Sequence, residues 1–208
     1  MEALKTLKYK GFTVEIHYDD DPSNPRTDFD CLGKMVCFHR NYIIGDKDHG
    51  FRDADEVMAH IKATKAVWLP VYLYDHSGLT INTTGFSCPW DSGQVGVIFV
   101  EREKALKEFG GKRQALTRAV RGKVEQCLRG EVETYDQMLR GEVYGYIVKK
   151  EGESEDSCWG FYGDMDYCID EAKGVVDSLV KAAVLKHAAK VKAYIQHKVP
   201  LEARAALA

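Results

Sequence analysis

The stretch Tyr74–Val100, YDHSGLTINTTGFSCPWDSGQVGVIFV, holds more residues capable of chemistry than any other part of the chain. It ends in a branched and aromatic run, 95–100, that is typical of a buried strand. The residues 85–93 before this run are rich in Gly, Ser, Pro and Asp, as loops require. A strand over 67–74 precedes the stretch, so we expect the two strands to form a hairpin. Pro70 in the first strand predicts an edge position or a bulge.

Two more strand pairs are predicted on either side of this hairpin. Phe12–Tyr18 alternates apolar and polar residues, and Met35–His39 is a second short strand, so we expect these two to pair. Val143–Val148 and Ser157–Tyr162 enclose the polar loop 149–156 and form the third predicted hairpin. The fold class predicted is therefore α+β, with a mainly antiparallel sheet of about three β-hairpins and helices on one side.

Spacings of three and four residues between apolar side chains predict helices in the rest of the chain. The predicted helices span residues 54–63, 101–109, 113–128 and 164–199. The last is a long C-terminal helix that ends before Pro200, with a tail at 200–208. The pentapeptide LRGEV occurs at 128–132 and 139–143, and we expect its second copy to mark a helix end and a strand start. At 208 residues, a single domain over 1–208 is expected.

Composition sets limits on partners and compartment. Hydrophobic residues at 45% and charged residues at 29% are ordinary for a globular protein, and a net charge of −3 gives no general reason to expect nucleic-acid binding. No apolar run reaches membrane-spanning length and no signal-peptide pattern occurs, so we expect a cytoplasmic protein without a membrane partner. The six Cys form no C-x-x-C pair, which predicts free thiols. No cofactor is expected.

One candidate for catalysis lies in the opening stretch. Cys88, His76 and either Asp75 or Asp91 are the residue types of a cysteine nucleophile, its base and an orienting acid. Such a site requires the imidazole within hydrogen-bond reach of the sulfur. No local signature of a known cysteine hydrolase surrounds Cys88. A cysteine-dependent hydrolase or transferase is therefore an alternative hypothesis, and the simpler interpretation is a polar loop without catalytic function.

Acidic residues offer a second candidate, a metal site. Asp19, Asp21 and Asp28 supply the hard oxygen ligands that calcium and magnesium prefer. Their spacing does not fit the EF-hand loop. A solvated turn explains the same residues, because Asp favours turns. We therefore predict no metal and keep these three carboxylates as the alternative.

Basic residues gather on two of the predicted helices. They are Arg113, Arg118, Arg121, Lys123 and Arg129 on one, and Lys181, Lys186, Lys190 and Lys192 on the C-terminal helix. Such faces can bind phosphates. Acidic neighbours are frequent and no nucleic-acid-binding motif is present, so a nucleic-acid-binding protein using the basic helices is an alternative only. The C-terminal helix can also pair with a second copy, which would make a homo-oligomer.

Five motifs resemble those of a family of uncharacterised small proteins encoded by bacteriophages and other mobile elements. They are MVCFHR (35–40), YDHSG (74–78), FSCPWDSGQVG (86–96), RGEVETYDQ (129–137) and SCWGFYG (157–163). The resemblance covers most of the chain and brings no catalytic residues with it. It implies a phage protein of the host bacterial cytosol that binds a host protein. Inhibition of a host defence or nucleic-acid-processing enzyme, as anti-CRISPR and anti-restriction proteins perform, is the expected role.

The favoured function is therefore that of a non-enzymatic binding module. Aromatic residues anchor protein interfaces out of proportion to their number. The predicted contact residues are His76, Trp90, Asp91 and Trp159 in the hairpin loops and strands. A binder predicts that Cys88→Ala leaves function intact, whereas the enzyme hypothesis predicts that it abolishes function.

Overall fold

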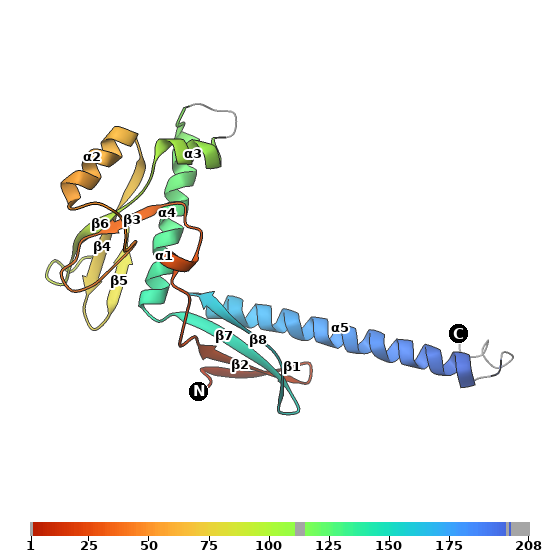
Figure 1. Ribbon diagram of the computed structural model, residues 1–208. Helices are drawn as coiled ribbons and strands as arrows, with labels where there is room; N and C mark the ends of the chain where they lie inside the picture. The colour runs from red at the N-terminus through yellow and green to blue at the C-terminus, as the bar shows by residue number, and fades with distance from the viewer. Residues whose placement is uncertain (1, 111–114, 199, 201–208) are drawn as a thin grey trace. The chain divides into compact units, whose positions relative to one another are not determined.

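The computed structural model describes residues 2–110, 115–198 and 200, and its elements group into two compact units (Figure 1). The first unit combines Met1–Asp19 with Tyr144–Ala208, and the second is Asp20–Val143. Each unit contains a four-stranded sheet and at least one long helix. The α+β class, with antiparallel strand pairing and a long C-terminal helix, is confirmed. The strands form two sheets where one was expected, and the single domain over 1–208 stays a prediction.

The first unit is a sheet with one helix on it. Its strands are β1 (Lys5–Tyr9), β2 (Phe12–Tyr18), β7 (Val143–Lys150) and β8 (Glu153–Tyr162), in the order β1-β2-β7-β8. The helix α5 (Met165–Lys198) packs its first turns on the sheet and buries Cys168, Ile169, Ala172 and Val176 against the apolar side chains of β2 and β7. As expected, a helix covers one side of the sheet in this unit.

The second unit has helices on both faces of its sheet. Its strands are β3 (Lys34–Cys37), β4 (Val67–Asp75), β5 (Leu79–Asn82) and β6 (Ser92–Val100), in the order β3-β6-β4-β5. The helix α4 (Arg118–Leu139) shares one core cluster with this sheet, and α2 (Ala54–Thr64) shares another with the opposite face. Two short helices, α1 (Pro25–Asp28) and α3 (Arg102–Phe109), complete the unit.

The predicted strand pairs are partly correct. The strands over 67–74 and 95–100 pair as β4 and β6, and a register shift between Val71 and Tyr72 follows Pro70 closely. The strands β7 and β8 are neighbours, as expected. The predicted pair of Phe12–Tyr18 with Met35–His39 is wrong, because β2 pairs with β1 and β7 while β3 pairs with β6. The sequence KTLKY of β1 was not recognised as a strand, since its residues are mostly polar.

The C-terminal helix agrees with its periodicity, whereas the helix predicted over 113–128 is α4, which runs from Arg118 to Leu139. The helix predicted over 164–199 is confirmed as Met165–Lys198, and the predicted tail, apart from Pro200, lies outside the described residues. The second LRGEV copy does mark the end of α4 at Leu139 and the start of β7 at Val143. Within the described part of the chain, no helix is long and apolar enough to cross a membrane.

Candidate functional site

Residues 83–91, which we call the Trp90 loop, connect β5 to β6. The side chain of Asn82, the last residue of β5, fixes the start of this loop. Its Oδ1 accepts the backbone N–H groups of Thr84 at 3.0 Å and Gly85 at 2.7 Å, and its Nδ2 donates to the Gly85 carbonyl at 3.2 Å. Asn side chains stabilise turns in this way. Gly85 adopts a φ of 87°, which glycine tolerates without strain.

The end of the Trp90 loop is fixed by three further hydrogen bonds. The backbone N–H of Asp75 donates to the Asp91 carbonyl at 2.9 Å, which ties the loop to the end of β4. The Ser92 hydroxyl donates to the Cys88 carbonyl, and the Cys88 thiol donates to Asp91 Oδ2 at 3.7 Å. The backbone of the loop is therefore held at both ends before any partner binds.

Three of the sequence-predicted residues do come together at this loop. His76 Nδ1 lies 3.4 Å from Asp91 Oδ2, and both side chains are exposed. The same carboxylate oxygen accepts from Cys88. Tyr74 of β4 lies beside this group: its ring is stacked on His76 at 5.8 Å between centroids and is tilted relative to Phe86 at 5.6 Å.

The order of these groups differs from that of a cysteine nucleophile. A catalytic thiol gives its proton to a base, which an acid then orients. Here Asp91 Oδ2 accepts a hydrogen bond from the Cys88 thiol and also lies 3.4 Å from His76 Nδ1. Among the described residues, the hydrogen bonds and ion pairs include none between His76 and Cys88, and the thiol donates to the acid instead.

Trp90 lies at the most exposed part of the loop. Its side chain is 91% exposed, compared with 37% for Trp68 and 39% for Trp159. Indole is largely apolar, and exposed apolar surface is normally reduced by folding. The hydrogen bonds described above hold the loop backbone without covering this ring. Trp90 is therefore the side chain of this site that a second molecule would bury.

The fourth predicted contact residue, Trp159, has a different environment. It belongs to β8 in the first unit, where its ring lies on the backbone of Gly145 in β7. A Cβ atom added to Gly145 would be 2.1 Å from a Trp159 ring carbon. Its centroid is also 6.2 Å from that of His17. Trp159 therefore packs on its own sheet, and it belongs to a different unit from the Trp90 loop.

The acidic residues considered for a metal site do not gather. Asp28 Oδ2 accepts the Asn24 N–H at 2.8 Å and its Oδ1 accepts from the Thr27 hydroxyl at 2.9 Å, so this carboxylate closes the turn of α1. Among the described residues, no group of three or more His, Cys, Asp or Glu side chains is arranged to hold a metal ion.

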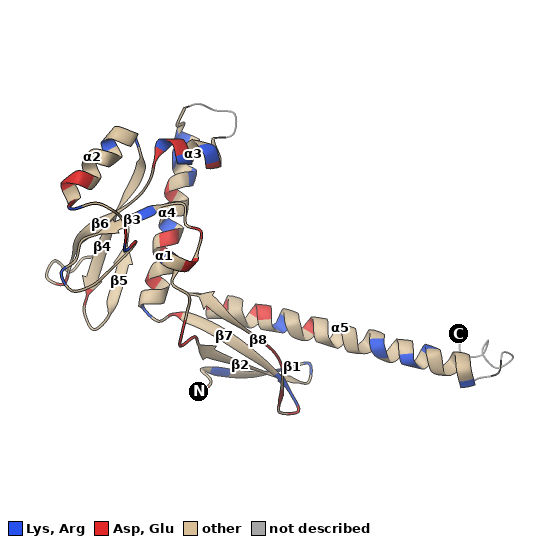
Figure 2. Ribbon diagram, viewed as in Figure 1, with Lys and Arg blue, Asp and Glu red and all other residues tan. Residues whose placement is uncertain are grey.

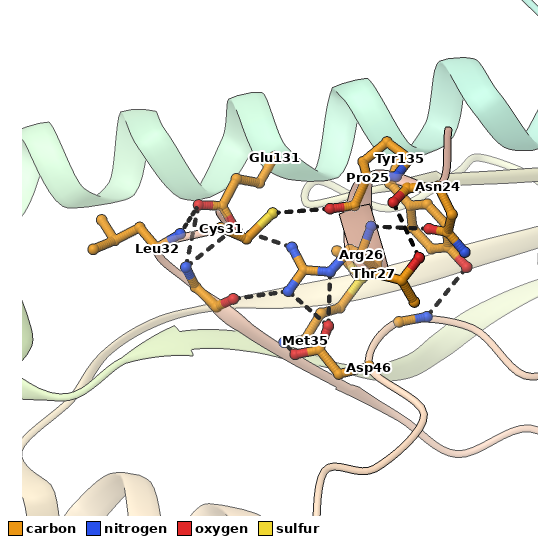
Figure 3. A network of polar contacts seen from close by, with 12 residues as sticks. Asn24, Pro25, Arg26, Thr27, Cys31, Leu32, Met35, Asp46, Glu131 and Tyr135 are labelled. Carbon is orange, nitrogen blue, oxygen red and sulfur yellow. Dashed lines mark hydrogen bonds and ion pairs between the residues drawn. The ribbon is translucent and has the colours of Figure 1, made fainter. Parts of the chain in front are cut away.

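A further polar cluster of the second unit was not predicted from the sequence (Figure 3). Arg26, at the start of α1, has a side chain only 1% exposed. Its guanidinium donates to Asp46 at 2.8 Å, to Glu131 at 3.0 Å and to the Gly33 carbonyl at 2.7 Å. Glu131 in turn accepts the Leu32 N–H at 2.7 Å. We call Arg26, Asp46 and Glu131 the Arg26 network.

The Arg26 network is a structural feature rather than a reactive site. Asp46 Oδ2 also accepts the N–H of Met35, so the network fixes both the loop before β3 and the loop after it to α4. A buried charge is tolerated when it is paired and fully hydrogen-bonded. The signal in the sequence was Glu131 of the first LRGEV copy, three residues after the buried Leu128 on α4. Periodicity alone does not say which residues Glu131 contacts.

Four of the six thiols are held in their protonated form. Burial raises the pKa of Cys37 and of Cys168 to about 12. Burial also raises the pKa of Cys31 and of Cys127, which lie beside the Arg26 network. Because the thiolate is the reactive form, these four side chains are poor nucleophiles.

The basic residues predicted to form faces lie on α4 and α5 (Figure 2). Arg118, Arg121, Lys123 and Arg129 are on α4, and Arg113 lies outside the described residues. Lys181, Lys186, Lys190 and Lys192 lie on α5, and their side chains are exposed. No known protein family, curated protein sequence or solved structure matches this chain.

Proposed function

We propose that this chain is a non-enzymatic binding protein whose contact surface is the Trp90 loop. The observation that carries the proposal is a tryptophan 91% exposed to water on a loop that hydrogen bonds hold at both ends. Covering an indole removes up to about 200 Å² of largely apolar surface from water, a gross gain of about 5 kcal/mol. A loop that is already ordered loses less conformational entropy when a partner binds.

The surroundings of Trp90 suit a protein partner. Protein interfaces combine a central aromatic anchor with a polar rim that keeps water away from it. Asp91, the next residue in the chain after Trp90, and His76, whose Nδ1 lies 3.4 Å from the Asp91 carboxylate, supply exposed polar groups. The hydrogen bond between Cys88 and Asp91 helps to fix this rim. The cysteine is thus assigned a supporting role in the loop and no role in catalysis.

The identity of the partner is proposed from the resemblance described above. A phage or mobile-element protein acts inside the bacterial host, so we propose a host cytosolic protein as the partner. Inhibition of a defence or nucleic-acid-processing enzyme is the role that such a small binding protein would perform. This part of the proposal rests on the resemblance of the motifs, whereas the assignment of the Trp90 loop as the contact surface rests on the geometry of the loop.

Affinity capture from bacterial lysate tests the proposal with three tagged proteins: the natural chain, Trp90→Ala and Trp159→Ala. We expect one host protein to be retained in stoichiometric amount by the natural chain and by Trp159→Ala, at low and at moderate salt. Trp90→Ala should weaken its retention by at least about thirtyfold, the effect of a 2 kcal/mol anchor. For Trp90→Ala, the free energy of unfolding measured by thermal denaturation should change by less than about 0.5 kcal/mol, because the removed indole ring is exposed. Equal retention by all three proteins would refute the proposal.

The cysteine-dependent alternative is separated from the binding function by Cys88→Ala. A binding protein should retain its partner with this variant, because only the thiol to Asp91 hydrogen bond is lost. A catalytic thiol, by contrast, would be essential even in a correctly folded chain. Loss of host-directed activity in folded Cys88→Ala, with capture of the partner unchanged, would favour the enzyme.

A further inference from the structure

A second surface of the unit Asp20–Val143 carries a different set of side chains. The end of α2, the start of β4 and the first turns of α4 line a hollow of about 590 Å³. Two large side chains in its lining are partly exposed, Trp68 at 37% and Met58 at 39%. Three cationic side chains, Lys62, Lys65 and Arg121, complete the charged part of the lining.

The charge of this hollow is of one sign. The described residues that line it include no Asp or Glu. Within the described part of the chain, none of the ion pairs formed by Lys and Arg includes Lys62, Lys65 or Arg121. Three cations without a carboxylate partner are a local departure from a net charge of −3. A concave surface of one sign concentrates ligands of the opposite charge.

The fold places these groups together by the way α2 ends. Lys65 adopts a left-handed conformation, φ 51°, and its N–H donates to the carbonyls of Ile61 and Lys62. This cap directs the chain into β4. There Val67 and Leu69 belong to the core cluster that the sheet shares with α4, and Trp68, between them in the strand, points to the opposite face of the sheet. Cations also stabilise the last turn of a helix. That effect explains Lys62 and Lys65, but it explains neither Arg121, which comes from α4, nor the partly exposed indole.

We propose that this hollow binds one nucleotide unit of a single-stranded nucleic acid. The unpaired base stacks on Trp68, and Lys62, Lys65 and Arg121 receive the phosphates on either side. Proteins that bind single strands combine stacking aromatic rings with a positively charged surface in this way. A base inside a duplex has no free face for the ring, so the aromatic component selects single strands. The site is separate from the Trp90 loop, and neither proposal depends on the other.

The test is fluorescence anisotropy of a labelled oligo-dT of about twelve nucleotides, within the range of single-strand site sizes, titrated with the full chain at several salt concentrations. Neutralising the two phosphates that flank the bound nucleotide predicts a slope of about −1.4 for the logarithm of affinity against the logarithm of salt. Trp68→Leu should weaken binding at least about fivefold. Arg121→Ala should make the slope shallower by about 0.7. Competition with unlabelled AMP distinguishes a free mononucleotide from a strand as the ligand. If AMP displaces the oligo-dT, the ligand is a free mononucleotide; if AMP does not displace it, the ligand is a strand.

Controls separate this hollow from other surfaces. Trp159→Leu removes a tryptophan of similar exposure, and Lys186→Ala removes a cation of α5, so both should leave the affinity unchanged. The double variant Trp90→Phe/Trp159→Phe leaves Trp68 as the remaining tryptophan, and oligo-dT should quench its emission. Absence of binding at about 10⁻⁴ M, the weak limit of non-specific affinity, would overturn the proposal. Binding that Lys186→Ala weakens and Trp68→Leu does not would also overturn it, by locating the nucleic acid on α5.

Discussion

The Arg26 network and the Trp90 loop belong to the same unit and use polar side chains for opposite results. In both, hydrogen bonds between side chains and the backbone hold irregular segments in place. The network encloses a guanidinium that is 1% exposed, so each interaction completes the interior. The loop leaves an indole that is 91% exposed. The comparison indicates that a fixed backbone carrying an uncovered apolar ring is arranged for a second molecule.

The largest expected effect comes from breaking the network. Arg26→Ala leaves the partly buried carboxylates of Asp46 and Glu131 without their buried cation, and we expect the free energy of unfolding to fall by about 3–5 kcal/mol. Urea denaturation measures this change. Arg52→Ala is the matched control, because the Arg52 side chain is 85% exposed in its pair with Glu56 and should contribute less than about 1 kcal/mol. Similar effects for the two variants would show that the network contributes little to stability.

A smaller effect is expected when the loop is released. Asn82→Ala removes the acceptor of the Thr84 and Gly85 N–H groups, and we expect the free energy of unfolding to fall by about 1–2 kcal/mol. Amide hydrogen exchange at these two residues should accelerate, and partner capture through Trp90 should weaken because the loop is no longer ordered. Asn82→Asp keeps the acceptor oxygen and should preserve most of the protection. If exchange is already fast in the natural chain, the loop is not preformed.

The smallest stability effect concerns a buried acid of α4 that contacts β5. Asp136 Oδ1 accepts the Ile81 N–H at 2.7 Å, and burial raises the pKa of this carboxyl above its usual 3.8. A raised pKa means that the folded state binds the proton more tightly than the unfolded state. The charged carboxylate therefore costs stability at neutral pH, and this cost is relieved as pH falls through the raised value toward 3.8.

Asp136→Asn isolates this titration, because the amide oxygen can still accept from Ile81. We expect the variant to differ from the natural chain by less than about 1.5 kcal/mol at pH 7. The natural chain should gain stability relative to the variant as pH is lowered from 7 to 4. Other acids are common to both proteins and cancel in the difference. A stability difference that does not vary with pH would show that Asp136 titrates as an exposed acid.

Sequence patterns predicted the elements whose structure is determined by residues close together in the sequence. The helix α5 follows from the spacing of its valines, and the pairing of β4 with β6 follows from two apolar strands within one stretch. The Trp90 loop was found because its residues are contiguous. His76 and Asp91 lie fifteen positions apart in sequence and meet because β4 and β6 are adjacent strands.

The parts that sequence patterns missed depend on distant residues. Arg26 and Glu131 lie in segments far apart in the chain, and no periodicity indicates that they meet. The strand β2 pairs with β7, whose position in the sequence is equally remote. Trp68 looks like any strand aromatic, and only its remaining exposure beside α2 distinguishes it. Local patterns therefore predict elements and loops, whereas long-range pairing and buried charge need coordinates.

Site-specific photocrosslinking tests the central claim most directly. The reactive residue p-benzoylphenylalanine is placed at position 90 in one protein and at position 167 in another, where Tyr167 is also an exposed aromatic. Both proteins are irradiated in bacterial cells and analysed by mass spectrometry. A single host protein crosslinked from position 90 and absent from position 167 is the predicted result. No crosslinked host protein from position 90, or the same proteins from both positions, would contradict the assignment of the Trp90 loop as a binding surface.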